Sequence, residues 1–243
     1  MKKPYVIIHS HTSLDGKIHA IDIPEFKTTA HQYQRLALDP DNHDKQVFNI
    51  QGYGNGRITT DDNFTFYRKP ALDEQAAKVP EGDFVADAES PMYYLSIDAS
   101  GRLGWTENFV DHGNVKAHVI EILTERATNA YKDFLRRMNI SYIIAGEDEL
   151  DKALVLHKLA TLFHMERIMI GGGGLLNWSF LQNGFVDEVS IVMAPIADGD
   201  PEAQSLFTAT EPFSKIQPFS FTLIDVQKLE DNAVWIRYKV NYN

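Results

Sequence analysis

Apolar runs alternate with amphipathic stretches along most of the chain. β-Branched and apolar runs predict buried strands, at residues 5–10, 47–50, 92–97, 118–123, 141–146, 168–170 and 186–194. Between them, apolar side chains recur every three to four residues, the period of a helix, over 25–38, 128–138, 150–163 and from 174 onward. Two last apolar runs, 219–226 and 234–240, flank Asp231-Asn232 and predict a hairpin. The pattern predicts one α/β domain over residues 1–243, with a central, mostly parallel mixed sheet flanked by helices and a C-terminal antiparallel hairpin.

Four consecutive glycines, Gly171 to Gly174, follow the apolar run at 168–170 and precede helical spacing. Each ordered glycine costs roughly 0.5–1 kcal/mol of backbone entropy relative to alanine, so four together need a reason. One reason is that bare backbone N–H groups at a helix N-terminus attract an anion, such as a nucleotide pyrophosphate. The other is a tight turn that lets the helix pack close to the sheet, and the glycines alone do not decide between the two.

The net charge of the chain limits the kinds of partner that it can bind. Lys and Arg number 23 and Asp and Glu 34, which gives a net charge of −11. This balance argues against a nucleic-acid or anionic-membrane partner. No run of 18 apolar residues occurs, and the apolar run near the N-terminus is too short for a signal peptide, so we expect a cytoplasmic protein. An anionic cofactor would need local compensation, for which the candidates are Arg57, Arg68, Arg102 and Arg126.

His9 and His11 lie two residues apart on the first predicted strand. Alternate side chains of a strand point the same way, so both imidazoles should share a face. Such a pair can line a polar pocket or bind a metal, and the pocket wall is the more common case.

Two stretches resemble a known family. Val6 to Ile18, with Ser13-Leu14-Asp15-Gly16-Lys17-Ile18, is similar to the first strand and S-L-D-G-K-I signature of the riboflavin-biosynthesis reductase domain. Gly171 to Asn177, continuing through Leu181 to Ile196, resembles that family's G-G-x-x-L-N, L-x-x-G-L-V-D-E-L and A-P motifs. Gly56 to Asp61 is similar to G-R-x-T-x-[DE] of related reductases. The family is the C-terminal domain of the bacterial deaminase-reductase and belongs to the dihydrofolate-reductase-like superfamily.

The resemblance implies a dihydrofolate-reductase-like fold, usually a homodimer. It also implies a reductase that binds NADPH and passes hydride to a pyrimidine- or pteridine-like small molecule, as 5-amino-6-(5-phosphoribosylamino)uracil reductase does. No metal is implied. The matching residues are assigned as follows: Gly172, Gly173, Gly174 and Leu175 to the pyrophosphate, His11, Thr59 and Asp61 to the surroundings of the cofactor, and Arg68 to the substrate phosphate.

Departures from the family leave the substrate open. The riboflavin-pathway enzymes usually carry lysine at the position of His9 and glutamate at that of Gly171, and both residues face the substrate. If a side chain donates a proton, we expect it to be His9, because imidazole titrates near neutral pH; its alternative role is a hydrogen-bonded pocket wall. The choice between NADPH and NADH also stays open, since Arg102 or Arg126 could each bind a 2′-phosphate.

Two other readings compete with the reductase. His9-Ser10-His11-Thr12 also resembles the H-x-H-T start of metal-dependent phosphoesterases, in which His9 and His11 would bind the metal. The protein could also be a non-catalytic nucleotide-binding protein of the same fold.

Overall fold

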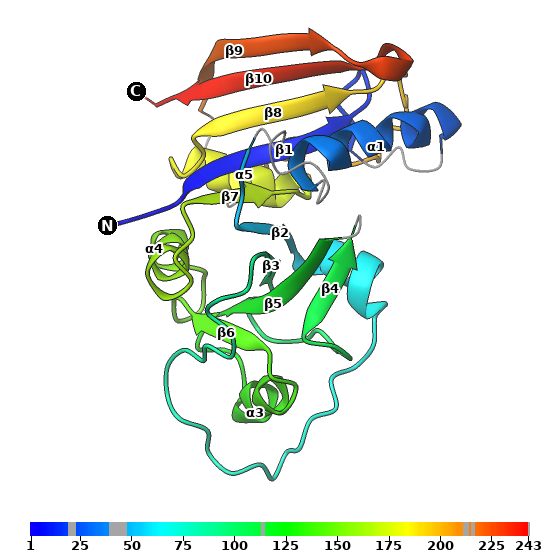
Figure 1. Ribbon diagram of the computed structural model, residues 1–243. Coiled ribbons are helices and arrows are strands. Elements are labelled where there is room, and N and C mark those ends of the chain that lie inside the picture. The colour runs from blue at the N-terminus through cyan, green and yellow to red at the C-terminus, as the bar shows by residue number, and fades with distance from the viewer. Residues whose placement is uncertain (19–22, 39–47, 113–114, 211–213, 215–216, 243) are drawn as a thin grey trace. The chain divides into compact units, whose positions relative to one another are not determined.

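The computed structural model describes residues 1–18, 23–38, 48–112, 115–210, 214 and 217–242 (Figure 1). The chain forms two compact units. The first unit is Met1–Pro4 with Ile50–Ile168, and the second is Tyr5–Asn49 with Met169–Asn243. Among the described residues, no helix has the length and apolar character needed to span a membrane. The single domain expected over residues 1–243 stays a prediction.

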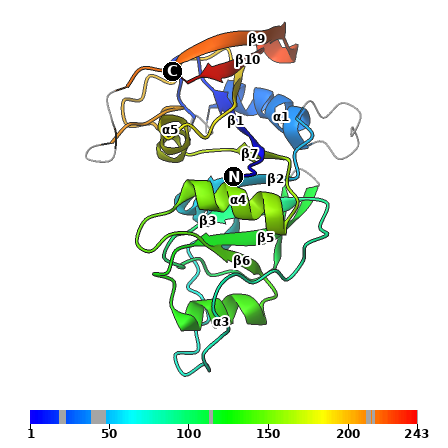
Figure 2. The same ribbon diagram turned by 90° about the vertical axis from the view of Figure 1, so that its left-hand side faces the viewer.

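The second unit contains a mixed sheet whose strands follow the order β1, β8, β10, β9. β1 and β8 are parallel, and both pairings of β10 are antiparallel. α1 and α5 lie on opposite sides of β1 and β8 (Figures 1 and 2). The elements of this unit are β1 (Tyr5–Thr12), α1 (Pro24–Leu38), α5 (Gly174–Gln182), β8 (Glu188–Met193), β9 (Ser220–Lys228), the turn η3 (Glu230–Asn232) and β10 (Val234–Asn241).

The first unit contains the parallel strands β2, β3, β5 and β6, which pair in that order. β4 pairs antiparallel with the first half of β5, and β6 pairs parallel with the second half of β5 along the same edge. Thr128 caps the N-terminus of α3 and Asp151 caps that of α4. The elements are β2 (Gly52–Gly56), α2 (Arg57–Thr60), η2 (Asp61–Thr65), β3 (Tyr93–Ile97), β4 (Phe109–His112), β5 (Val115–Leu123), α3 (Asn129–Arg137), β6 (Ser141–Ile144) and α4 (Lys152–Leu162). β7 (Arg167–Ile170) crosses the division between the units.

The α/β fold, the mostly parallel pairing and the C-terminal antiparallel hairpin are confirmed. The strand expected at residues 47–50 is wrong: Val47 lies outside the described residues, and 48–50 form no strand. The strand here is β2, which consists largely of the glycines that follow. A Cβ on Gly54 would stand 2.2 Å from the carbonyl oxygen of Leu95. Close backbone approach, not hydrophobic patterning, therefore accounts for this strand.

Candidate functional site

The four-glycine turn leads directly into α5, as expected. Gly173 is the N-cap residue, and no side chain among the described residues caps this helix end. Gly172 has φ 114°, a backbone conformation that favours glycine. The turn thus presents uncapped backbone N–H groups at the positive end of a helix.

Gly174 has a different reason to be glycine. A Cβ there would stand 2.1 Å from the carbonyl oxygen of Ser205 and 2.6 Å from Thr208 Oγ1. The backbone N–H of Thr208 in turn donates to the carbonyl of Gly174 at 3.1 Å. Gly174 is therefore required by packing against residues 205–208, a reason that differs from both explanations considered from the sequence.

Residues 198–208, here called the covering segment, join the turn after β1 to the turn before α5. Asp15 accepts hydrogen bonds from the backbone N–H groups of Asp198 and Gly199, both at 3.0 Å. The Ser13 hydroxyl and these two N–H groups hold the pKa of Asp15 well below its usual range. Further along, the segment is fixed by three backbone bonds: Ile18 N to Gln204 O at 2.8 Å, Leu206 N to Gly16 O at 2.9 Å, and Thr208 N to Gly174 O.

His9 is fully buried, contacts α1, and has a hydrogen-bond partner at each ring nitrogen. The Tyr33 carbonyl, 3.1 Å from Nε2, can only accept, so Nε2 carries the proton. The Ser190 hydroxyl, 2.8 Å from Nδ1, then donates to the imidazole and accepts from the Trp235 indole at 2.8 Å. Burial lowers the pKa of His9 to about 4. A neutral imidazole with both nitrogens engaged is suited to a structural role, the pocket wall, rather than to proton donation.

His11 points to the same face of β1 as His9, because it also contacts α1. Its ring stacks on Phe26 with centroids 3.8 Å apart. Thr29 donates its hydroxyl proton to the Phe26 carbonyl at 3.1 Å and therefore accepts from His11 Nε2 at 2.8 Å. Burial lowers the pKa of His11 to about 4 as well. Within the described residues, no group of three or more His, Cys, Asp and Glu side chains is placed to hold a metal ion.

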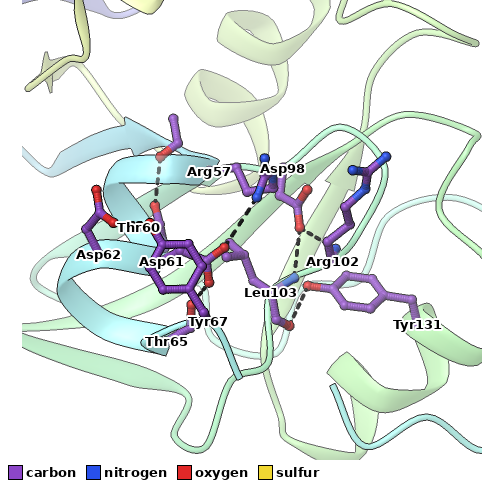
Figure 3. A network of polar contacts seen from close by, with 11 residues as sticks. Arg57, Thr60, Asp61, Asp62, Thr65, Tyr67, Asp98, Arg102, Leu103 and Tyr131 are labelled. Atoms are coloured by element: carbon purple, nitrogen blue, oxygen red, sulfur yellow. Dashed lines mark hydrogen bonds and ion pairs between the residues drawn. The ribbon is translucent and has the colours of Figure 1, made fainter. Parts of the chain in front are cut away.

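Thr59 and Asp61 lie in the first unit, at α2 and the start of η2. Asp61 is buried, pairs with Arg57 at 3.3 Å, and also accepts the hydroxyl proton of Thr65 (Figure 3). Thr59 is half-buried, and its carbonyl accepts from the Asn63 amide at 2.7 Å. Both residues therefore help to hold the α2–η2 turn in place.

Arg68 is exposed in the first unit, beyond η2. Its guanidinium lies 5.8 Å from the ring centroid of Phe66, and its Nη1 is 3.4 Å from Thr106 Oγ1. The residues predicted from the sequence thus fall into two groups. His9, His11 and Gly172 to Leu175 belong to the second unit, whereas Thr59, Asp61 and Arg68 belong to the first.

Two buried acids of the first unit were missed by the sequence analysis. Asp98, directly after β3, accepts from the backbone N–H groups of Arg102 and Leu103 (Figure 3). Glu121, in the middle of β5, accepts from the Trp105 indole. Burial, and then the charge of Asp98, raises the pKa of Glu121 well above its usual value. An acidic residue inside the apolar run at 118–123 was the available signal.

Comparison with known proteins decides the family. Residues 4–234 match the RibD C-terminal domain family. The chain belongs to this family. A relative from Aquifex aeolicus, named 2,5-diamino-6-ribosylamino-4(3H)-pyrimidinone 5′-phosphate reductase, is 23% identical over 89% of this chain and 88% of its own. A protein of the same name from Methanothermobacter thermautotrophicus is 37% identical over 70 residues, which cover 29% of this chain and 32% of that protein.

Solved structures show the same fold. A pyrimidine reductase-like protein from Corynebacterium diphtheriae has a TM-score of 0.69 at 16% identity, covering 99% of this chain and 93% of its own. RibD from Acinetobacter baumannii has a TM-score of 0.63 at 22% identity, and the match spans 98% of this chain and 58% of that one. The family and the fold predicted from the sequence are therefore confirmed. The names of the relatives support the prediction of a reductase of riboflavin biosynthesis that acts on a small molecule.

Proposed function

We propose that this protein is an NADPH-dependent reductase that transfers hydride to a phosphorylated pyrimidine of the kind named for its relatives. The observation that carries the proposal is the uncapped glycine turn before α5, in a chain that matches the RibD C-terminal domain family over residues 4–234.

The turn fits the pyrophosphate of a nicotinamide cofactor. Gly172 and Gly173 offer backbone without side chains, and the N–H groups of the first turn of α5, including that of Leu175, point out of the helix end. The bound nicotinamide would supply the hydride, and the protein would supply orientation and charge compensation. The net charge of −11 makes these local donors the more important.

NADPH is proposed over NADH on the resemblance stated from the sequence, with arginine as the candidate ligand of a 2′-phosphate. Two arginines of the first unit lie near Asp98, which directly follows β3. Burial raises the pKa of Asp98; the backbone N–H groups of Arg102 and Leu103, and then the positive charges of Arg57 and Arg102, partly oppose this rise. Figure 3 shows the Arg102 guanidinium directed away from the network, whereas Arg57 pairs with Asp61. Arg102 is therefore the side chain proposed for the 2′-phosphate, and the exposed Arg68 is proposed for the phosphate of the substrate.

His9 is assigned a positioning role in this proposal. Its bonds to Tyr33 of α1 and Ser190 of β8 join the helix to the sheet beneath it. His11 makes a second such connection through Thr29. The pair thus fixes the carboxyl end of β1, from which the Ser13-to-Ile18 turn leads to the covering segment.

A homodimer is proposed through the hairpin. Phe221, Leu223 and Val226 of β9 are opposite Val240, Tyr238 and Ile236 of β10, so they share one face of the hairpin. Their side chains are 37%, 53% and 54% exposed. Contiguous exposed apolar side chains of this kind are typical of protein interfaces. Replacing Leu223 with Asp should convert the dimer to a monomer in light scattering, and a wild-type monomer would refute the proposed homodimer.

The cytoplasmic location stays a prediction from the sequence.

The activity test uses the compound named for the relatives. The protein is mixed with 2,5-diamino-6-ribosylamino-4(3H)-pyrimidinone 5′-phosphate and NADPH, and cofactor oxidation is followed together with the mass of the product. The proposal expects oxidation that depends on the pyrimidine and a product that has gained a hydride and a proton. Cofactor binding without oxidation of NADPH by this compound or by related pyrimidines and pteridines would support the non-catalytic alternative instead.

A further inference from the structure

Gln204 of the covering segment places its carboxamide over the glycine turn. Its Oε1 lies 2.5 Å from the position that a Cβ on Gly173 would occupy, whereas its Nε2 is 4.0 Å from that point. The oxygen, which carries the partial negative charge, is therefore the atom of Gln204 that lies nearest the N-cap of α5. No side chain among the described residues caps this helix end.

The main chain of Gln204 is held firmly, but its side chain is not. The carbonyl of Gln204 accepts from Ile18 N at 2.8 Å, and the carbonyl of the preceding Ala203 accepts from Lys17 Nζ at 3.0 Å. Gln204 is exposed, and its carboxamide makes no hydrogen bond to any other described residue. The carboxamide can therefore leave the turn by rotation about its side-chain bonds, without breaking a hydrogen bond.

The turn has a second polar feature. Asn177, in α5, is fully buried and donates from Nδ2 to the Leu206 carbonyl at 2.9 Å. Its Nδ2 lies 3.8 Å from the position of a Cβ on Gly172, and its Oδ1 has no hydrogen-bond partner among the described residues. A buried polar atom without a partner costs free energy unless a water or a ligand satisfies it. The turn thus has a buried polar side chain beside it, one of whose two polar atoms has no partner among the described residues.

We propose that Gln204 is a gate residue: its amide oxygen lies against Gly173 at the glycine turn, and an incoming pyrophosphate displaces it. This inference rests on the cofactor role proposed above for the turn. A neutral carboxamide interacts with the helix end more weakly than an anion does, because the helix dipole favours full negative charge. An anionic group therefore displaces the carboxamide more readily than a neutral group does.

In this proposal, the side chain at position 204 determines the affinity of the glycine turn for pyrophosphate-containing ligands. Alanine removes the group that must be displaced, so the affinity for pyrophosphate-containing ligands should rise. Glutamate places a carboxylate at the same point, where it would interact with the helix end and repel the ligand, so the affinity should fall. The effect of glutamate should diminish as the pH falls below about 4.3, where an ordinary glutamate becomes protonated.

The experiment measures the dissociation constants of NADPH and of inorganic pyrophosphate for the wild type, Gln204→Ala and Gln204→Glu. Glu202→Gln is the matched control, because Glu202 is exposed on the same segment and the change also alters one charge. Gln204→Ala should bind both probes about two- to fivefold more tightly, the range expected for a group at a helix end. Gln204→Glu should bind both at least about tenfold more weakly at pH 7, and Glu202→Gln should match the wild type within about twofold.

Either of two results would overturn the gate: Gln204→Ala binding both probes no more tightly than the wild type, or Glu202→Gln, which removes a negative charge, tightening binding by as large a factor as Gln204→Glu weakens it. A wild type that binds pyrophosphate but neither NADPH nor NADH would refute the proposed cofactor, and the pyrophosphate measurements would still test the gate. A wild type that binds NADPH, with Gln204 variants that bind it equally well, would refute the gate alone. Gln204 is exposed, so all the variants should keep the melting temperature of the wild type.

Discussion

Alanine at Gly174 should destabilise the protein through a clash with its own backbone. The new Cβ would stand 2.1 Å from the Ser205 carbonyl oxygen and 2.6 Å from Thr208 Oγ1. The covering segment would have to move away by about 1 Å to restore a normal contact, and overpacking of this kind costs about 1–3 kcal/mol. Alanine returns up to about 1 kcal/mol through its higher helix propensity. The net loss should be about 1–2 kcal/mol.

This loss can be measured by urea unfolding and by thermal melting. For a protein of this size, 1 kcal/mol shifts the melting temperature by about 2–4 °C, so Gly174→Ala should melt about 2–8 °C below the wild type. Gly173→Ala is the matched control, because its Cβ would meet only the mobile end of Gln204. That variant should lose only about 0.5 kcal/mol, because alanine is a poorer N-cap residue than glycine. Equal destabilisation by both variants, or no loss in Gly174→Ala, would refute the packing argument.

Four further predictions follow from the geometry. Gly173→Val should fold but lose cofactor binding, because the side chain would occupy the place of the phosphate; a variant that binds NADPH normally in a fluorescence titration would contradict the glycine cradle. His9→Phe should unfold at lower urea concentration than the wild type. The pKa of His9 is about 4 in the folded state against 6.5 for an ordinary histidine, so the free energy of unfolding of the wild type should fall by on the order of 3 kcal/mol as the pH drops from 6.5 to 4. The variant should lack this fall. An unchanged pH profile in this variant would show that His9 is not held neutral. Glu121→Gln should be more stable than the wild type at pH 7, because the raised pKa of Glu121 means that wild-type stability falls as the pH rises above the ordinary value of 4.5. A less stable variant in urea unfolding would contradict the raised pKa of this buried acid. Arg102→Gln should lower the preference for NADPH over NADH by about tenfold, measured as the ratio of dissociation constants, and an unchanged ratio would exclude Arg102 from the 2′-phosphate site.

Hydrophobic periodicity and short motifs were enough to predict the fold class and the glycine turn. The strand period placed His9 and His11 on one face, and the structure has both imidazoles against α1. The turn before α5 was predicted from four adjacent residues. These features are local, so the sequence alone carries them.

Features that depend on contacts between distant segments could not be predicted in this way. Gly174 is required by Ser205 and Thr208, which approach it only in the folded chain. His9 was expected at a cleft, but the structure has it buried against α1. The sequence does not show this contact. The roles of Asp98 and Glu121 depend on burial and on backbone or indole donors from other segments.

A titration with NADPH and separately with NADH tests the central claim most directly. Quenching of the three tryptophans and the nicotinamide fluorescence would both report binding. The account predicts micromolar binding that favours NADPH and is lost in Gly173→Val. Failure of the wild type to bind either dinucleotide would contradict the account of the glycine turn as a cofactor site.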